Sequence, residues 1–258
     1  MLEIQNLRAG YPGNPVLNDI CLTIPQGAVT VIAGPNGCGK STLLKALTGI
    51  LPASGSVRLE GQELLTLSRR ELAKKVAFLP QNRPIPEITV KNLVLHGRFP
   101  YLSYPRHYRQ EDLVIAQTAM EKMGVAELAD RMITTLSGGQ RQKVYIAMAL
   151  AQDTPVILLD EPNTFLDIAH QLQLMEQAKA LAAEGKTVVL VLHDLSMALD
   201  CSDSLAVLLE GKCLFQGNPE EAFLSGSLER AFGIQIHRLH TSIGWKYYFS
   251  GINSQNFK

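Results

Sequence analysis

The stretch Gly34-Pro35-Asn36-Gly37-Cys38-Gly39-Lys40-Ser41-Thr42 decides the fold of this chain. It follows an apolar, β-branched run, Val29–Ala33, and precedes a helical pattern at residues 42–49. It matches G-x-x-x-x-G-K-[ST] in the strand–loop–helix context that this motif requires. The glycines let backbone N–H groups turn inward toward phosphate oxygens, and the following helix directs its positive end at them. The stretch therefore predicts a nucleotide phosphate site.

The polar members of this loop have separate expected roles. Lys40 is expected to reach the β- and γ-phosphates, and Ser41 to offer its hydroxyl to Mg²⁺. Cys38 lies near Lys40 and a helix start, which predicts a favoured thiolate whose alkylation blocks activity unless ATP·Mg²⁺ protects it. A glycine-rich turn beside a surface lysine is the structural alternative for the whole stretch.

Short apolar runs recur outside this loop, and helical patterns separate several of them. Continuous apolar strands that alternate with helices are typical of a buried, mainly parallel sheet in an α/β fold. Leu2, Ile4 and Leu7 alternate instead with polar positions, which indicates a small antiparallel sheet beside the main one. The expected strands lie at residues 20–24, 29–33, 57–59, 76–79, 156–159, 188–192 and 205–209.

The stretch at residues 84–152 differs from its flanks. It opens with Pro84 and Pro86, and tyrosine alternates with proline between Pro100 and Pro105. Helical patterns follow at residues 111–123 and 140–152. We interpret the stretch as a mainly helical insertion between two strands.

Composition excludes several classes of protein. The 258 residues include 24 Lys+Arg and 24 Asp+Glu, and this zero net charge argues against nucleic acid or an anionic membrane held by bulk charge. No nucleic-acid partner is therefore expected. No apolar run reaches the ~18–20 residues of a bilayer span, and the N-terminus lacks a signal-peptide pattern. Four widely separated cysteines argue against a zinc knuckle or a disulfide framework and suit a reducing cytosol.

Two carboxylates end the apolar run at residues 156–159. Asp160 is expected to hold Mg²⁺ directly or through a water, and Glu161 to polarise the water that attacks the γ-phosphate. Two adjacent acids repel one another unless a cation is near, which favours a metal site. The structural alternative is an acidic turn before Pro162.

A second glycine element, Ser137-Gly138-Gly139-Gln140, precedes a helical run. Ser137 is a typical N-cap, and the two glycines expose the first N–H groups of the helix. The element is either an ordinary cap or a second phosphate site. One chain cannot easily fold both glycine loops around one nucleotide, whereas two chains facing each other head-to-tail can.

The order and spacing of these three motifs resemble the ABC ATPases over roughly the first 235 residues. The resemblance implies one ABC ATPase domain at residues 1–258, with a P-loop NTPase core, an N-terminal antiparallel β subdomain and an inserted helical subdomain. The RecA-like core with its β subdomain would comprise residues 1–83 and 153–235, the helical subdomain residues 84–152, and a C-terminal tail residues 236–258. It also implies ATP with Mg²⁺ and a homodimer or equivalent ABC dimer.

The resemblance assigns further residues around the nucleotide. Tyr11 matches the aromatic residue that stacks on adenine, although a core or turn tyrosine also fits there. Gln81, in Leu79-Pro80-Gln81, matches the Q-loop glutamine that touches Mg²⁺ or the attacking water. His193 matches the switch histidine on the γ-phosphate. The implied catalytic residues are Lys40, Gln81, Glu161 and His193, and the implied metal ligands are Ser41, Gln81 and Asp160.

The resemblance also predicts contacts across a dimer seam. Asp167, in Phe165-Leu166-Asp167, matches the D-loop aspartate. This chain has Asn163 where the family commonly has Thr or Ser. The implied contacts to the ATP of the second copy come from Ser137, Gly138, Gly139, Gln140 and Asp167.

Local segments resemble the ATPases of iron–siderophore, haem and cobalamin importers. These importers imply an ATP hydrolase at the cytoplasmic membrane face, held there by permease subunits and served indirectly by an extracytoplasmic substrate-binding protein. The segment at residues 99–108 is a candidate docking surface for the permease, or a loop packed on its own subdomain. The resembling segments are residues 89–94, 97–101, 165–171, 192–195 and 231–234.

Two other classes of function remain open at this point. One is a non-transport ABC ATPase, such as one that assembles iron–sulfur clusters on a soluble scaffold. The other is a nucleotide-binding module without hydrolysis, which is the weaker alternative because each residue needed for hydrolysis has a match.

Overall fold

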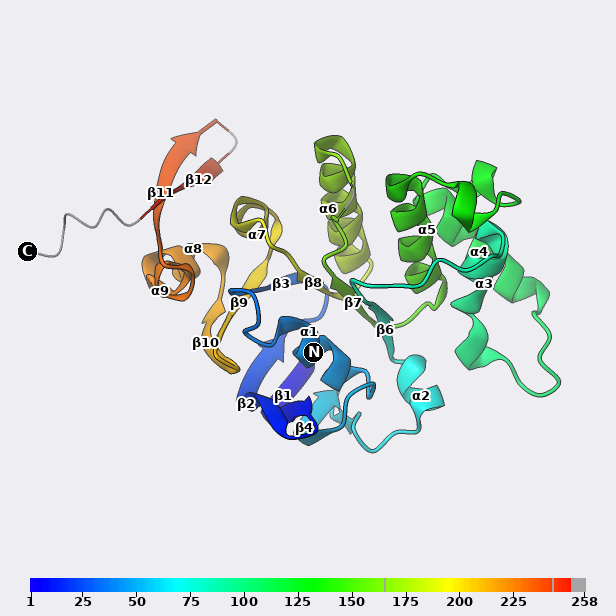
Figure 1. Ribbon diagram of the computed structural model, residues 1–258, viewed down its shortest axis with the longest axis horizontal. Coiled ribbons are helices and arrows are strands. Elements are labelled where there is room, and N and C mark those ends of the chain that lie inside the picture. Colours follow the sequence, from blue (N-terminus) through cyan, green and yellow to red (C-terminus); the bar gives the residue numbers. More distant parts are fainter. Residues whose placement is uncertain (165, 243, 252–258) are drawn as a thin grey trace, which may run out of the picture.

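The computed structural model describes residues 1–164, 166–242 and 244–251. Phe165 of the predicted seam segment, and residues 252–258 at the end of the predicted tail, lie outside the described residues. Figure 1 shows a central sheet with a smaller sheet beside it, a helical part on one side and a projecting hairpin on the other.

The central sheet has six strands in the order β10-β9-β3-β8-β7-β6, and only β10 runs antiparallel to its neighbour. The strands β3, β7 and β8 are buried along their whole length, as expected for a parallel sheet covered on both faces. The predicted α/β fold is confirmed. The strands are β3 (Val29–Ala33), β6 (Val76–Leu79), β7 (Val156–Asp160), β8 (Thr187–Val191), β9 (Ser204–Leu209) and β10 (Lys212–Gly217).

Two hydrophobic layers cover the central sheet. On one face, α1 (Lys40–Leu47) packs between the sheet and the N-terminal strands through Leu43, Leu44 and Leu47. On the other face, α6 (Ile168–Ala183) and α7 (Leu195–Cys201) pack on alternate residues of the same strands. This sandwich fixes the strand ends, which carry the polar residues described below.

The N-terminal sheet is antiparallel, with the order β2-β1-β4-β5. Its strands alternate buried and exposed residues because one face packs on α1 and the other faces solvent. The predicted β subdomain is therefore present. The strands are β1 (Leu2–Tyr11), β2 (Asn14–Ile24), β4 (Ala53–Leu59) and β5 (Gln62–Glu63), and a short helix, α2 (Arg69–Ala73), follows them.

The segment between β6 and β7 is mainly helical. Arg98 joins its three α-helices, since its side chain pairs with Asp112 of α4 at 2.9 Å and donates to the Ala151 carbonyl of α5 at 3.0 Å. Only 6% of the Arg98 side chain and 7% of the Asp112 side chain are exposed, so the pair is buried. The elements are α3 (Val90–His96), η1 (Phe99–Tyr101), α4 (Gln110–Lys122), η2 (Ala126–Leu128), η3 (Ile133–Thr135) and α5 (Gly138–Ala151).

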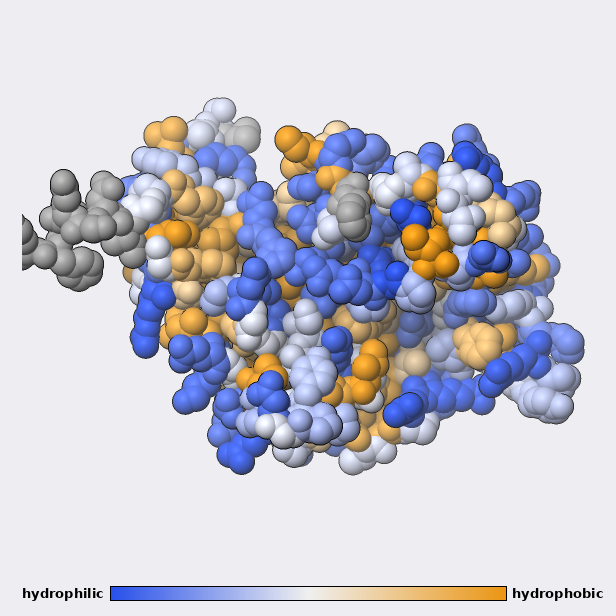
Figure 2. Space-filling view, viewed as in Figure 1, coloured by the Kyte–Doolittle hydropathy of each residue, from blue (hydrophilic) through white to orange (hydrophobic). Residues whose placement is uncertain are grey.

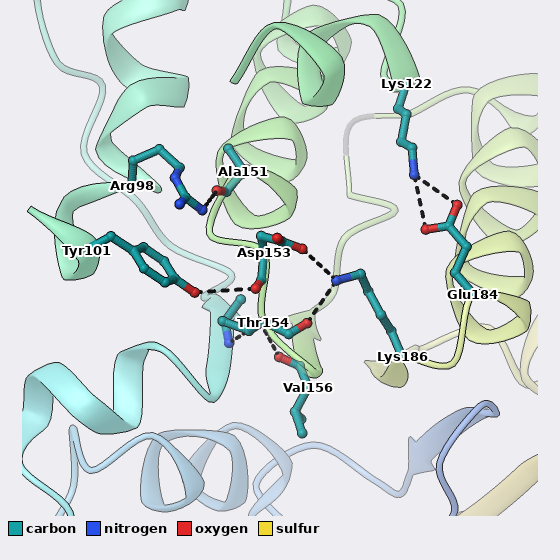
Figure 3. Close-up of polar contacts among 10 residues, drawn as sticks. Arg98, Tyr101, Lys122, Ala151, Asp153, Thr154, Val156, Glu184 and Lys186 are labelled. Carbon is teal, nitrogen blue, oxygen red and sulfur yellow. Dashed lines mark hydrogen bonds and ion pairs between the residues drawn. The ribbon is translucent and has the colours of Figure 1, made fainter. Parts of the chain in front are cut away.

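The helical segment returns to the core through residues 152–155, which we call the root (Figure 3). Lys186, just before β8, donates to the Asp153 carboxylate at 2.9 Å and the Thr154 carbonyl at 3.2 Å. The Thr154 hydroxyl accepts from the Ala77 N–H at 3.1 Å, which ties the root to β6. The root is thus bonded to strands on both sides of β7.

The last described residues form a hairpin of β11 (Ile234–Thr241) and β12 (Gly244–Gly251) where the sequence indicated only a tail. Arg238 holds the hairpin to α8 (Pro219–Leu224), because its guanidinium lies 4.8 Å from the Phe223 ring and pairs with Glu220 at 3.1 Å. Apolar side chains gather over α8, α9 (Ser227–Phe232) and β11 in Figure 2. Across the described parts of the chain, every helix is too short or too polar to span a bilayer.

Candidate active site

The phosphate loop connects β3 to α1 with its glycines in left-handed or strained conformations. Gly39 has a φ of 109°, and a Cβ there would lie 2.6 Å from the Leu17 side chain, so glycine is required. Lys40 is buried within the loop, and its ammonium donates to the Gly34 carbonyl at 2.7 Å and the Pro35 carbonyl at 3.0 Å. The loop therefore curves around the Lys40 ammonium, as the motif predicts.

Cys38 departs from its expected chemistry. The side chain is buried against the Gly34 backbone, and burial raises the pKa of the thiol although Lys40 acts to lower it. The prediction of a favoured thiolate is therefore wrong. The sequence rule counts the nearby cation and the helix start, but it does not count the loss of water around the sulfur.

Asp160 ends β7 beside Val191 of β8 with only 2% of its surface exposed. Burial raises the pKa of this carboxyl, and the nearby Ser41 hydroxyl works against that rise. Its Oδ1 atom has no hydrogen-bond partner within the described ranges. A buried carboxylate with an unpaired oxygen is costly unless a cation offsets its charge.

The oxygen donors at this point fit Mg²⁺. The Ser41 hydroxyl and the Asp160 carboxylate meet at the mouth of the phosphate loop. Mg²⁺ takes oxygen ligands and is commonly held by one or two carboxylates together with substrate phosphates. Among the residues that the structure describes, no group of three or more His, Cys, Asp or Glu side chains could form an all-protein metal cage. The donor set thus suits an ion that arrives with a nucleotide.

Glu161 follows β7 and contacts residues that follow the neighbouring strands β6 and β8. The Gln81 amide, just after β6, donates to Glu161 Oε2, and His193 Nε2, just after β8, lies 2.5 Å from Glu161 Oε1. Glu161 is buried and has a φ of 52°, which costs on the order of 1–3 kcal/mol for a residue with a side chain. The Thr164 hydroxyl donates to the Glu161 carbonyl at 3.0 Å and so holds this turn. Two predicted catalytic residues, Gln81 and His193, therefore contact a third, Glu161.

Tyr11 lies at the end of β1 with 44% of its surface exposed. Lys45, on α1 one turn beyond the phosphate loop, donates to the Tyr11 hydroxyl at 3.2 Å and lies 5.8 Å from its ring centroid. The tyrosine is therefore a surface ring and not a core residue. Its position beside α1 suits stacking on a base whose phosphates lie in the loop.

The predicted trans residues lie together, apart from the phosphate loop. Ser137 caps α5, with Gln140 N–H donating to its hydroxyl at 3.2 Å, and Asp167 caps α6 through the His170 N–H at 2.9 Å. The His170 N–H and ring hold the pKa of Asp167 below its usual value. The two caps face one hollow of about 580 Å³, lined by Ser137, Gly139, Gln140, Lys143, Asp167 and His170. Within the described ranges, no hydrogen bond joins these residues to the phosphate loop.

Two polar residues near the site were missed by the sequence reasoning. Gln142 of α5 donates to the Pro162 carbonyl at 2.6 Å, and Arg83 donates to Gln142 at 2.7 Å. A signal for Gln142 exists, because residues 142, 145, 146 and 149 form a buried stripe with helical spacing. A glutamine on such an apolar stripe needs buried partners. Arg83 has no comparable sequence signal, since it lies in an irregular loop.

Known proteins resemble this chain in sequence. A family model described as ABC transporter matches residues 17–164. The chain is 43% identical to the ferric enterobactin transport ATP-binding protein FepC of Escherichia coli (strain K12), covering 91% of this chain and 88% of FepC. It is 42% identical to the iron(3+)-hydroxamate import ATP-binding protein FhuC of Bacillus subtilis (strain 168), and the match covers 90% of this chain and 88% of FhuC.

Solved structures agree with the sequence relatives. A metal-chelate type ABC transporter in an inward-facing conformation has a chain with a TM-score of 0.83 at 27% identity, and the match covers 98% of both chains. A dimeric bacterial ABC transporter cassette has a TM-score of 0.74 at 29% identity, covering 85% of this chain and 99% of that one. The chain therefore belongs to the ABC transporter family. It is an ABC-type ATPase, as the resemblance of its motifs predicted.

Proposed function

We propose that this chain is the ATP-hydrolysing subunit of an importer for ferric-siderophore-type iron chelates, acting as a pair of copies beneath separate membrane subunits. The observation that carries the proposal is the contact of Gln81 and His193 with one buried carboxylate, Glu161, beside the phosphate loop. The transported class is supported by relatives such as FepC and FhuC, whose names specify ferric enterobactin and iron(3+)-hydroxamate.

The chemistry assigned to this chain follows from its side chains. Lys40 and the loop N–H groups bind the β- and γ-phosphates, and Glu161 accepts a proton from the attacking water. His193, which lies beside Glu161, would contact the γ-phosphate. Ser41 and Asp160, with the Gln81 oxygen, would hold Mg²⁺, which supplies positive charge to the β- and γ-phosphate oxygens when bound.

A complete site requires the second copy. The hollow lined by Ser137, Gly139 and Asp167 offers hydroxyl and N–H donors at the start of α5, which suit an anion. A second chain placed head-to-tail brings this hollow over the first chain's phosphate loop. Closure would then complete both ATP sites at once, and hydrolysis would let the pair reopen.

The proposed docking surface for the permease is a groove of about 770 Å³ between α2 and the segment at residues 99–108. Arg70 fixes this segment to α2 by donating to the Pro100 and Leu102 carbonyls at 2.9 and 2.7 Å. Tyr104 nevertheless stays 96% exposed, and Arg106 stacks on Phe99 at 4.6 Å. Aromatic and arginine side chains are favoured at interfaces, so the groove suits a cytoplasmic loop of a membrane subunit.

The transport proposal is tested by uptake of ⁵⁵Fe bound to enterobactin-type and hydroxamate-type chelators in cells of the source organism. Deletion of the gene for this chain is expected to abolish uptake of one chelate, and the wild-type gene to restore it. The Glu161→Gln gene is expected not to restore it. Unchanged uptake of every chelate, together with lowered iron–sulfur enzyme activity, would instead support a cluster-assembly ATPase.

A further inference from the structure

A chain of polar contacts centred on the buried Gln142 connects the Q-loop, which is the segment at residues 80–88, to the turn after Glu161. Arg83 Nη2 donates to Gln142 Oε1 at 2.7 Å, and Gln142 Nε2 donates to the Pro162 carbonyl at 2.6 Å. Both ends of the Gln142 amide are thus used. Only 3% of Gln142 is exposed, so the loss of either partner would leave a buried amide group unpaired, which is costly.

Arg83 is held from a second direction. Its guanidinium lies 4.5 Å from the centroid of the Tyr145 ring, and the Tyr145 hydroxyl donates to the Pro84 carbonyl at 2.6 Å. Burial lowers the pKa of Arg83 to about 10, so the side chain remains a cation near neutral pH. The Q-loop is therefore fastened to two residues of α5 that lie on the same buried stripe.

Together with the backbone, these contacts form a closed path that includes Glu161. Gln81 touches Glu161, Arg83 follows Gln81 by two residues, and Gln142 connects Arg83 to Pro162, the neighbour of Glu161. The helix that supplies Gln142 also begins at Ser137, which faces the hollow for the second ATP. One rigid helix therefore contacts both the site of its own chain and the predicted seam.

We propose that Arg83 and Gln142 are positioning residues that couple the start of α5 to the geometry of Gln81 and Glu161. We call their contacts the Arg83–Gln142–Pro162 linkage. When α5 engages the nucleotide of the second copy, the linkage moves the Q-loop and the Glu161 turn together. This inference rests on the proposed ATPase function, and it adds how the two sites of a pair communicate.

The test compares Arg83→Met and Gln142→Met with a matched control, Arg98→Met. All three replacements remove polar contacts and keep a long, flexible side chain, but the polar partners of Arg98 are Asp112 and Ala151, both within the helical segment. The linkage predicts that kcat for ATP falls about 10- to 100-fold in the first two variants, while the Kd for ATP changes little. Arg98→Met is expected to lower thermal stability without a selective fall in kcat at unchanged Kd for ATP.

Two further variants separate positioning from packing. The double variant Arg83→Met/Gln142→Met is expected to lose no more activity than the less active single variant. Either single change already breaks the one path of contacts from Arg83 through Gln142 to Pro162, so the two effects do not add. Arg83→Lys keeps a donor for Gln142 and is expected to retain more activity than Arg83→Met. Because Arg83 lies in a loop, its variants remain informative even if Gln142→Met does not fold.

Hydrogen exchange supplies a readout that does not depend on hydrolysis. Gln142→Met is expected to speed amide exchange at residues 80–88 and 161–164 in the nucleotide-free chain, whereas Arg98→Met leaves both segments unchanged. Equal exchange in the two variants, or losses of kcat that multiply in the double variant, would overturn the linkage. If the wild type releases no phosphate but exchange changes as expected, the ATPase function and the positioning role fail, and only the mechanical connection between α5 and the Q-loop stands.

Discussion

The helical subdomain joins the core at two places that differ in construction. At the root, the chain passes from α5 to β7 within a few residues, and Lys186, Asp153 and Thr154 bond it to the neighbouring strands (Figure 3). At the Q-loop, the chain is irregular and mostly exposed, and side chains hold it to Glu161 and α5.

From this difference we expect the Q-loop, and not the root, to respond to nucleotide. The bonds at the root join backbone and side chains far from the phosphate loop, so they serve as a fixed attachment. The Q-loop side chains bond to Glu161 and to Gln142, and Gln142 in turn donates to the Pro162 carbonyl. A change at the proposed γ-phosphate position beside Glu161 would therefore alter these contacts. Changes at the Q-loop should therefore affect turnover, and changes at the root should affect stability.

Glu161→Gln should give the largest loss of turnover, because it changes the carboxylate that Gln81 of the Q-loop contacts. The amide keeps the shape of the side chain but cannot accept a proton from water, so kcat should fall about 100- to 10,000-fold. ATP binding should persist, as measured by a nucleotide-dependent rise in Tm. Phosphate release at the wild-type rate would remove Glu161 from the role of general base.

Gln81→Ala should weaken turnover less. It removes the contact to Glu161 and one proposed metal ligand but leaves the proposed base, Glu161, in place, so kcat should fall about 10- to 100-fold. The Tm of the nucleotide-free chain should change little because Gln81 is exposed. A stability loss as large as that of a core substitution would contradict the assignment of the Q-loop as a responsive connection.

Asp112→Asn should mainly affect stability, since it leaves the buried Arg98 guanidinium without its carboxylate partner. The expected loss at pH 7 is about 3–5 kcal/mol of unfolding free energy. Burial acts to raise the pKa of Asp112, but the Arg109 N–H and the Arg98 guanidinium outweigh it and keep that pKa below its usual value.

A carboxyl with a lowered pKa stabilises the fold above its unfolded pKa, and this stabilisation disappears as the pH falls through the folded value. The stability difference between wild type and Asp112→Asn should therefore shrink under acid conditions. Chemical denaturation at a series of pH values measures it. If the difference in unfolding free energy stays constant into strong acid, the charge of Asp112 does not contribute to its contact with Arg98.

Lys122→Ala should have the smallest effect. Lys122 of α4 pairs with Glu184 at 2.9 Å across the gap between the helical subdomain and the core, and both side chains are well exposed. Exposed pairs contribute about 0–1 kcal/mol, and salt screens them. Thermal unfolding at low and high salt should show a small loss that vanishes at high salt. A large, salt-independent loss would mean that this pair, and not the root, holds the subdomain.

Much of the fold could be predicted because buried parallel strands leave a plain signal. Val29–Ala33 and Val76–Leu79 are short apolar runs that the structure shows as β3 and β6. The hairpin β11–β12 could not be predicted in this way. Its strands mix histidine, arginine and aromatic residues, and Arg238 packs on rings from two elements instead of following a simple alternation.

The site could be predicted where a motif fixes local geometry, as for the loop around Lys40 and the pair Asp160 and Glu161. Contacts between distant residues had no such signal. Arg83 and Gln142 are 59 positions apart and meet only because α5 packs beside the Q-loop. Cys38 shows a second limit, because burial outweighs the nearby cation and raises the pKa of its thiol.

The central claim is that two copies of this chain close around ATP at Glu161 and the facing hollow. Sedimentation velocity of Glu161→Gln, with ATP·Mg²⁺ and with ADP·Mg²⁺, tests it most directly. The account predicts a shift from one copy to two with ATP and no shift with ADP. A chain that binds ATP but sediments as a single copy in both conditions would contradict it.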